Sequence, residues 1–156
     1  MLKDYQKKII DLLEQLETRM ADLYRLFAVK YPRRKDLWDL LVAEETRHAE
    51  YIRNLRTLVD EGKVIFDEKM TKTYTVQTFI DNVKNIYAEV EAGKVPLAKA
   101  LIVSNDFEQS IIERKFYDYF ILKDPALRAI LNEIKTDTFQ HSSKINKALQ
   151  EEKNRT

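Results

Sequence analysis

An all-α fold is predicted for this chain of 156 residues by three observations. Glycine occurs twice and proline three times, so the residues that tight turns between strands require are scarce. Charged residues make up 34% of the chain and hydrophobic residues 44%, and the two kinds are mixed at short intervals. Apolar residues recur at steps of three, four and seven, a spacing that gathers them on one face of a helix. The length is that of a single domain spanning residues 1–156.

Two helices are expected in the first part of the chain. The first covers Asp4 to Val29 and ends before Pro32, which cannot continue a helix. The second begins near Lys35 or Asp36 and ends before Gly62, a residue that suits a helix C-cap. Their apolar stripes are Ile10, Leu13, Met20, Tyr24 and Phe27 in the first helix, and Leu37, Leu41, Ile52, Leu55 and Val59 in the second. Because the loop between them is short, they should pack as an antiparallel pair.

A long connection follows at residues 63–96. It opens with the apolar patch Val64-Ile65-Phe66, which we expect to cover the end of the helices. It also contains one more helix, from Thr75 to Val90. Gly93 and Pro96 close the connection and start the next long helix.

Two long helices are expected after this connection. The first carries Leu97, Leu101, Ile111 or Ile112, and Tyr119 on its stripe, and the second, opened by Pro125, carries Ile130, Ile134, Ile145 and Leu149. The polar tail at residues 150–156 should fray. Two helices, a long crossover and two more helices are typical of a four-helix bundle with one crossover connection.

The composition excludes several classes of protein. The chain has no Cys, which rules out disulfides, Cys-ligated zinc, iron–sulfur clusters and a thiol nucleophile. Its net charge of +1 argues against a nucleic-acid partner, because neutralising several phosphates needs a basic excess on one face. The opening residues MLKDYQKK lack the apolar stretch of a signal peptide, and no run of about 18 apolar residues follows. We therefore expect a cytoplasmic protein that binds no membrane.

Polar residues interrupt the apolar stripe of each long helix, where burying a charge is costly unless it is paired. The interruptions are Glu17 in the first helix, Glu45 and His48 in the second, Glu108 in the third, and Thr138 and His141 in the fourth. Both histidines of the chain are among them. Glu14, by contrast, lies about 60° from Glu17 around the helix axis, where it is easier to solvate. The five Glu and His residues are therefore candidate ligands of a buried metal ion.

The spacing of Glu45 and His48 favours metal binding. Residues at i and i+3 project from adjacent turns of one face, so a carboxylate oxygen and an imidazole nitrogen can reach a single ion. One Glu on each of two helices, with Glu-x-x-His on each of the other two, is the ligand set of ferritin-like di-iron proteins. Here Thr138 stands where the second motif would have Glu before His141.

The segments DLYRLFA (residues 22–28) and LWDLLVAEETRHA (residues 37–49) resemble the rubrerythrin-like branch of the ferritin-like superfamily. The resemblance extends from the first helix to Leu149, and it implies a ferritin-like four-helix bundle. It also implies the metal ligands: Glu17 and His48 for a first ion, Glu45 as a bridge, and Glu108 and His141 for a second ion.

The resemblance further implies a protein that binds one or two iron ions, with manganese or zinc as alternatives, and that oxidises ferrous iron or reduces peroxide. The Cys-rich rubredoxin module of rubrerythrins is absent, so this activity would need an external electron donor. Three carboxylates balance one divalent ion more easily than two, unless water, hydroxide or a displaced acid such as Asp137 supplies the missing ligand. A homodimer is the default assembly.

A metal-free bundle that acts as a structural or interaction module is the competing hypothesis. Glu17 could then pair with Arg47, and Glu108 with Lys99 or Lys144, within a buried hydrogen-bonded network. His141 could likewise be a core histidine bonded to a neighbouring acid such as Glu45 or Glu108. Iron storage in a large shell is a third interpretation, for which the sequence identifies no pore or nucleation residue.

The remaining aromatic and charged residues have ordinary interpretations. Tyr24, Tyr117, Tyr119 and Trp38 are expected to be core or interface aromatics with no part in the chemistry. The charge runs at 33–35 and 151–153 are expected to be a solvated loop and a solvated tail.

Overall fold

The computed structural model describes residues 2–155, which form five α-helices and one pair of short strands. The helices are α1 (Asp4–Lys30), α2 (Lys35–Asp60), α3 (Thr73–Glu91), α4 (Leu97–Arg114) and α5 (Pro125–Asn154). The strands are β1 (Ile65–Phe66) and β2 (Phe120–Ile121), and two 3₁₀ turns cover Pro32–Arg34 and Phe116–Tyr119. The predicted all-α class is therefore confirmed.

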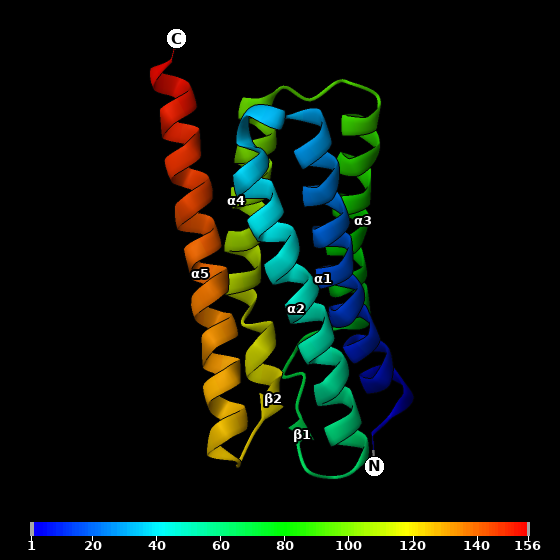
Figure 1. Cartoon of the computed structure of the whole chain (residues 1–156). Helices are drawn as coiled ribbons and strands as arrows, with labels where there is room; N and C mark the ends of the chain where they lie inside the picture. The colour runs from blue at the N-terminus through cyan, green and yellow to red at the C-terminus, as the bar shows by residue number, and fades with distance from the viewer. Residues whose placement is uncertain (1, 156) are drawn as a thin grey trace.

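The helices pack as two pairs, with α3 along one side (Figure 1). α1 lies along α2, α4 lies along α5, and α3 packs against α1. α3 runs from the end of the molecule that holds the N-terminus to the opposite end, so α4 begins at the same end as the turn between α1 and α2 (Figure 1). α2 also contacts α5, which joins the two pairs around one core.

Backbone geometry explains where the helices end. α2 ends ahead of Gly62, whose φ of +75° is a left-handed conformation that glycine adopts without strain. α4 ends at Arg114 because Lys115 is also left-handed, with a φ of +54°. The prediction that this helix reaches Tyr119 was wrong, since apolar spacing continues through a 3₁₀ turn that buries its aromatic side chains.

α5 extends beyond its predicted apolar stripe. It runs to Asn154, so the expectation of a frayed tail was wrong for the described residues, while Thr156 lies outside them. Glu152 is buried near the end of α5, where Arg33 and Arg34 bind its carboxylate. The charge runs that contain these residues were predicted to be solvated. Instead, their ion pairs fasten the last turns of α5 to the turn between α1 and α2.

The two strands join the long connection to the segment between α4 and α5. Ile65 pairs with Ile121 and Phe66 pairs with Phe120, in antiparallel register. Both strands lie toward the end of the molecule that holds the N-terminus (Figure 1). Val64 and Phe66 are buried, as expected for a patch that covers the helices, whereas Ile65 is exposed.

The core is apolar toward the C-terminal end of α1. Trp38, Tyr24 and Phe27 are the largest fully buried side chains, and their rings contact one another. This aromatic packing surrounds one side of the polar cluster described below, since Tyr24 belongs to both. Among the described helices, none is long and apolar enough to cross a membrane.

Candidate metal centre

The five predicted ligand residues come from four helices and are all buried. Glu17 lies on α1, Glu45 and His48 lie on α2, Glu108 lies on α4, and His141 lies on α5. None of the five is more than 3% exposed. The interrupted stripes therefore predicted their burial correctly. Acids and imidazoles this deep in a protein need polar partners or a metal ion.

Glu17, Glu45 and His48 form the first group of donor atoms. His48 Nδ1 lies 3.5 Å from Glu45 Oε2 and 3.9 Å from Glu17 Oε2. One donor atom from each residue falls within 4.8 Å of the other two, so the group could hold a metal ion.

Glu45, Glu108 and His141 form the second group. His141 Nδ1 lies 3.0 Å from Glu45 Oε1 and 3.6 Å from Glu108 Oε1, and one donor atom of each residue again falls within 4.8 Å of the others. Glu45 therefore faces both histidines, with one carboxylate oxygen toward each. The two imidazole rings are stacked with their centroids 5.7 Å apart, which places the two groups side by side.

Each of the five candidate ligands has at least one buried donor atom without a hydrogen-bond partner. These atoms are one oxygen each of Glu17 and Glu108, both oxygens of Glu45, and the Nδ1 atoms of His48 and His141. The distance of 3.0 Å from His141 Nδ1 to Glu45 lacks the alignment of a hydrogen bond. In the described part of the chain, Trp38 Nε1 is the one other buried side-chain nitrogen or oxygen left without a partner. Unsatisfied polar atoms therefore concentrate at this single place in the core.

Each histidine meets an acid on its outer nitrogen. His48 Nε2 lies 3.5 Å from Asp137 Oδ2, and His141 Nε2 bonds the carboxylate of Glu44. A carboxylate on the outer nitrogen fixes the imidazole tautomer that leaves Nδ1 free to bind a metal, so both rings are oriented as metal ligands usually are. Arg47 also binds Asp137.

These outer acids were not identified as such from the sequence. The sequence offers Asp137 as a substitute ligand inside the centre, but the structure places its carboxylate at the outer nitrogen of His48. Glu44 was missed because it lies off the apolar stripe of α2 and is half-buried. The one available signal was its position next to Glu45 in the chain, which is a weak one on a helix rich in acids.

Two tyrosines bond Glu108 and Glu17, the acids that each belong to only one of the two groups. Tyr24 donates to Glu108 Oε1 at 2.6 Å, and Tyr117 donates to Glu17 Oε1. Both tyrosines are buried, and each leaves the second oxygen of its carboxylate without a hydrogen-bond partner. The sequence predicted these tyrosines to be core aromatics, and it gave no signal for their hydrogen bonds to the acids.

Burial and mutual repulsion shift the pKa values of the acids apart. Burial, reinforced by the charge of Glu45, raises the pKa of Glu17 well above its usual range and raises the pKa of Glu108 to about 7. Burial also acts to raise the pKa of Glu45, but the close polar groups of Glu17, His141 and His48 hold it well below its usual range. Of the three acids, the shared Glu45 is therefore the one that ionises most readily in the metal-free protein.

The imidazole of His141 responds to the same acids. Burial acts to lower its pKa, but Glu108 and Glu45 outweigh burial and raise the pKa to about 11. The metal-free cluster therefore holds protons that a divalent cation would replace, since both kinds of charge neutralise the same carboxylates.

Thr138 is buried one turn before His141, at the position where the second motif lacks its acid. Its hydroxyl donates to the carbonyl oxygen of Ile134 at 3.0 Å. With no carboxylate at this position, α5 contributes a single candidate ligand, whereas α2 contributes two. This imbalance distinguishes the two groups.

The ion pairs proposed for a metal-free cluster do not form among the described residues. Arg47 binds Asp137 and Glu133 rather than Glu17. Glu108 has Tyr24 and His141 beside it, and neither Lys99 nor Lys144 makes an ion pair with it. The other part of that alternative, in which His141 contacts neighbouring acids, agrees with its distances to Glu45 and Glu108.

The geometry defines the class of site, namely a buried carboxylate–imidazole cluster that could hold a metal ion. No family model matches this chain, and no curated protein or solved structure is significantly similar to it.

Proposed function

We propose that this chain is a ferritin-like protein, of the rubrerythrin-like kind, that binds iron at the cluster centred on Glu45. In this proposal α1, α2, α4 and α5 form the four-helix bundle, and α3 belongs to the crossover between its two halves. The observation that carries the proposal is the set of buried, unpartnered donor atoms on all five predicted ligands.

This observation favours metal binding because unsatisfied buried polar atoms are expensive. Leaving one such group without a partner costs about 1–3 kcal/mol, and more if it is charged. The two groups share the carboxylate of Glu45, and each residue in them has at least one oxygen or nitrogen without a partner. A divalent cation in either group would satisfy the donor atoms of that group.

The ion that we propose is iron, because oxygen and nitrogen donors from Glu and His form the ligand set of ferritin-like di-iron proteins. Manganese and zinc accept the same donors, so the residues alone do not separate the three metals. When bound, iron supplies the redox chemistry of ferrous oxidation or peroxide reduction. An external donor supplies the electrons, since the chain has no Cys to hold a rubredoxin iron.

The chain's own residues prepare the centre for an ion. Tyr24 and Tyr117 hold the carboxylates of Glu108 and Glu17 in place, and burial keeps water away from them. Asp137 and Glu44 orient the imidazoles from outside. These contacts leave at least one oxygen or nitrogen of each candidate ligand without a partner, so the site needs little rearrangement to bind a metal.

The first ion should bind to the group that contains His48. That group combines Glu17 with the complete Glu45-x-x-His48 pair, both members of which lie on α2. Once Glu45 is engaged there, the second group retains Glu108, His141 and the other oxygen of Glu45. We therefore propose that the chain alone binds one ion tightly and a second ion weakly.

Thermal melting of chelator-treated protein tests the proposal. An ion that binds only the folded state stabilises it by about 2.7 kcal/mol at a hundredfold excess over the dissociation constant. For a chain of this size, about 1 kcal/mol corresponds to roughly 2–4 °C, so Tm should rise by about 5–10 °C with ferrous, manganous or zinc ion.

Calcium is the matched control for this experiment, because it prefers six to eight oxygen ligands and should give little or no shift. Equal shifts with calcium would indicate non-specific binding to surface acids. No shift with any of the four cations, on protein shown to be metal-free, would contradict metal binding.

One observation favours the competing function, a metal-free structural module. Because its pKa is raised, the ring of His141 can carry a proton, and the resulting positive charge lies beside Glu108 and Glu45. This charge partly neutralises the two carboxylates, as a metal ion would. Under this alternative the protein purified without chelator contains no metal, and added metal leaves Tm unchanged. The melting experiment therefore decides between the two.

A further inference from the structure

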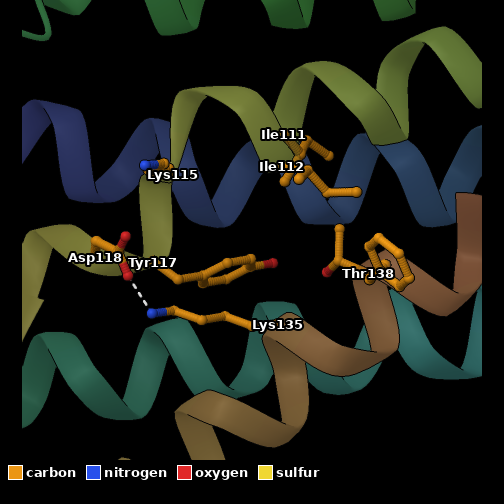
Figure 2. A pocket seen from close by; sticks show the side chains of 8 residues that line it. Ile111, Ile112, Lys115, Tyr117, Asp118, Lys135 and Thr138 are labelled. Atoms are coloured by element: carbon orange, nitrogen blue, oxygen red, sulfur yellow. Dashed lines mark hydrogen bonds and ion pairs between the residues drawn. The ribbon is translucent and has the colours of Figure 1, made fainter.

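A cavity of about 180 Å³ lies beside the cluster, between α4, α5 and the 3₁₀ turn Phe116–Tyr119 (Figure 2). Ile111 and Ile112 of α4 form one wall, and Phe139 of α5 adds an exposed ring. Near the middle of the view, the hydroxyl end of Tyr117 points toward Thr138 (Figure 2). The cavity is thus mainly apolar, and it occurs on the side of the cluster where the acid is missing.

Tyr117 and Thr138 are the lining residues of this cavity that lie next to the cluster. The ring of Tyr117 lines the cavity while its hydroxyl donates to Glu17, and the same ring stands edge-on to His48 at 6.3 Å between centroids. Thr138 lines the cavity from one turn before His141. A residue longer than Thr at position 138 would project from the same face as His141.

Lysines give the mouth of the cavity a positive character. Lys115 and Lys135 both line it, together with Asp118, which pairs with Lys135 (Figure 2). Lys115 makes no ion pair with any residue that the structure describes. One positive charge therefore remains at the mouth without a counter-charge, which favours the entry of an anion.

We propose that this cavity binds a small carboxylic acid with an apolar body, whose carboxylate takes the place of the acid that Thr138 does not provide. The proposal rests on the function proposed above, because the bound carboxylate becomes a ligand of the second metal group. With it, four carboxylates face the four positive charges of two divalent ions, in place of the three from Glu17, Glu45 and Glu108.

The size of the cavity sets the size of the acid. An engineered protein cavity of about 150 Å³ holds benzene, so the present one accommodates a six-membered ring with a carboxylate attached. Benzoate is therefore a suitable probe. Benzamide has nearly the same shape but no charge, and it serves as the matched control.

Equilibrium dialysis of the protein against manganous ion, in a buffer free of carboxylic acids, tests the proposal. Wild type should bind one ion per chain, and a second ion should bind when benzoate is added but not when benzamide is added. Calorimetric titration provides the reciprocal measurement, because linkage requires the metal to strengthen benzoate binding as much as benzoate strengthens metal binding. We expect at least about tenfold tighter benzoate binding in the presence of manganese, or about 1.4 kcal/mol.

Two variants locate the effect. Thr138→Glu supplies the acid from the chain, so it should bind two ions without benzoate and should not respond to benzoate. Ile112→Trp fills the cavity from α4, so it should retain the first ion and lose the benzoate response. Ile102→Trp makes the same substitution at an exposed position of α4 away from the cavity, and it should respond as wild type does.

The possible failures are distinguishable. If wild type binds manganese but benzoate changes nothing, or if benzamide acts as well as benzoate, the carboxylate proposal is wrong while the metal site stands. If Ile112→Trp still responds to benzoate, the anion binds elsewhere and the cavity assignment is wrong. If wild type binds no metal in any condition, the proposed function fails, and this inference fails with it.

Discussion

The cluster has two halves that are built alike, one around His48 and one around His141. Each half has an acid bonded by a tyrosine, an imidazole with its Nδ1 inward, and an outer acid on Nε2. They differ at one position, where α2 places Glu45 and α5 places Thr138. The two halves thus share one framework and differ in one candidate ligand, which under the proposed function sets how many ions the cluster holds.

The two halves also differ in what lies next to position 138 on α5 and next to Glu45 on α2. Thr138 is shorter than Glu, and a cavity that could admit a ligand from outside lies next to it. The half around His48 has two candidate ligands, Glu45 and His48, on one helix. Position 138 therefore borders a cavity in this chain, whereas Glu45 occupies the corresponding place on α2.

Glu45→Gln should have the largest effect, because Glu45 belongs to both halves. Removing its charge leaves each half without its shared ligand, and metal affinity should fall by more than about 100-fold, beyond the loss typical of outer partners. Manganese binding measured by equilibrium dialysis checks this. Glu50→Gln, an exposed acid on the same helix, is the control and should bind as wild type does. Equal binding by both variants would contradict the shared role of Glu45.

His48→Ala and His141→Ala should separate the halves. Loss of His48 removes the tight first ion, whereas loss of His141 should leave that ion bound, because Glu17, Glu45 and His48 remain. Metal counts on the two variants check the difference. Glu14→Ala is the control, since Glu14 pairs with Arg53 outside the cluster. If Glu14→Ala loses as much metal as His48→Ala, the metal does not bind at the buried face of α1 and α2, and the proposed site is wrong.

Replacing the outer acids should produce a smaller loss. Asp137→Asn should weaken the ion beside His48, and Glu44→Gln should weaken the ion beside His141, each by about 10- to 100-fold. Titrating each variant with manganese in the presence of benzoate measures both ions. Loss of the opposite ion in either variant would mean that the pairing of acids with histidines is misassigned.

The stabilising effect of metal should grow with pH. The raised pKa values of Glu17 and Glu108 mean that metal-free protein holds protons there, which a cation must displace. Since the folded pKa of Glu108 lies above its unfolded value, metal-free stability is lost as pH rises through about 7. Metal affinity gains about tenfold per pH unit for each proton displaced. Melting at pH 6 and pH 8, with and without manganese, should show the larger metal-induced rise in Tm at pH 8.

The buried residues of the site were predictable because the buried face of each helix shows a regular spacing of apolar residues in the sequence. Glu17, Glu45, His48, Glu108 and His141 each stand where an apolar residue is expected, and the structure buries all five. The same reasoning could not find Glu44 or Tyr117. Glu44 is half-buried and breaks no stripe, and the hydrogen bond of Tyr117 depends on the 3₁₀ turn that follows α4.

The ends of the helices were less predictable than their cores. Lys115 terminates α4 by adopting a left-handed conformation, which lysine rarely does and which no sequence pattern marked. The contact of Arg33 and Arg34 with Glu152 joins residues far apart in the chain, and periodicity within one helix carries no information about such pairs. From the sequence alone, polar runs such as these are therefore predicted to be solvated, even where the tertiary structure pairs them.

Anomalous scattering at the iron edge tests the central claim most directly. Crystals grown from protein purified without chelator, then reconstituted with ferrous ion, should show an anomalous peak within ligand distance of Glu17, Glu45 and His48. A full peak there with a weak or absent peak beside Glu108 and His141 is the predicted result. Iron-loaded crystals with no anomalous peak among these five side chains would contradict the account.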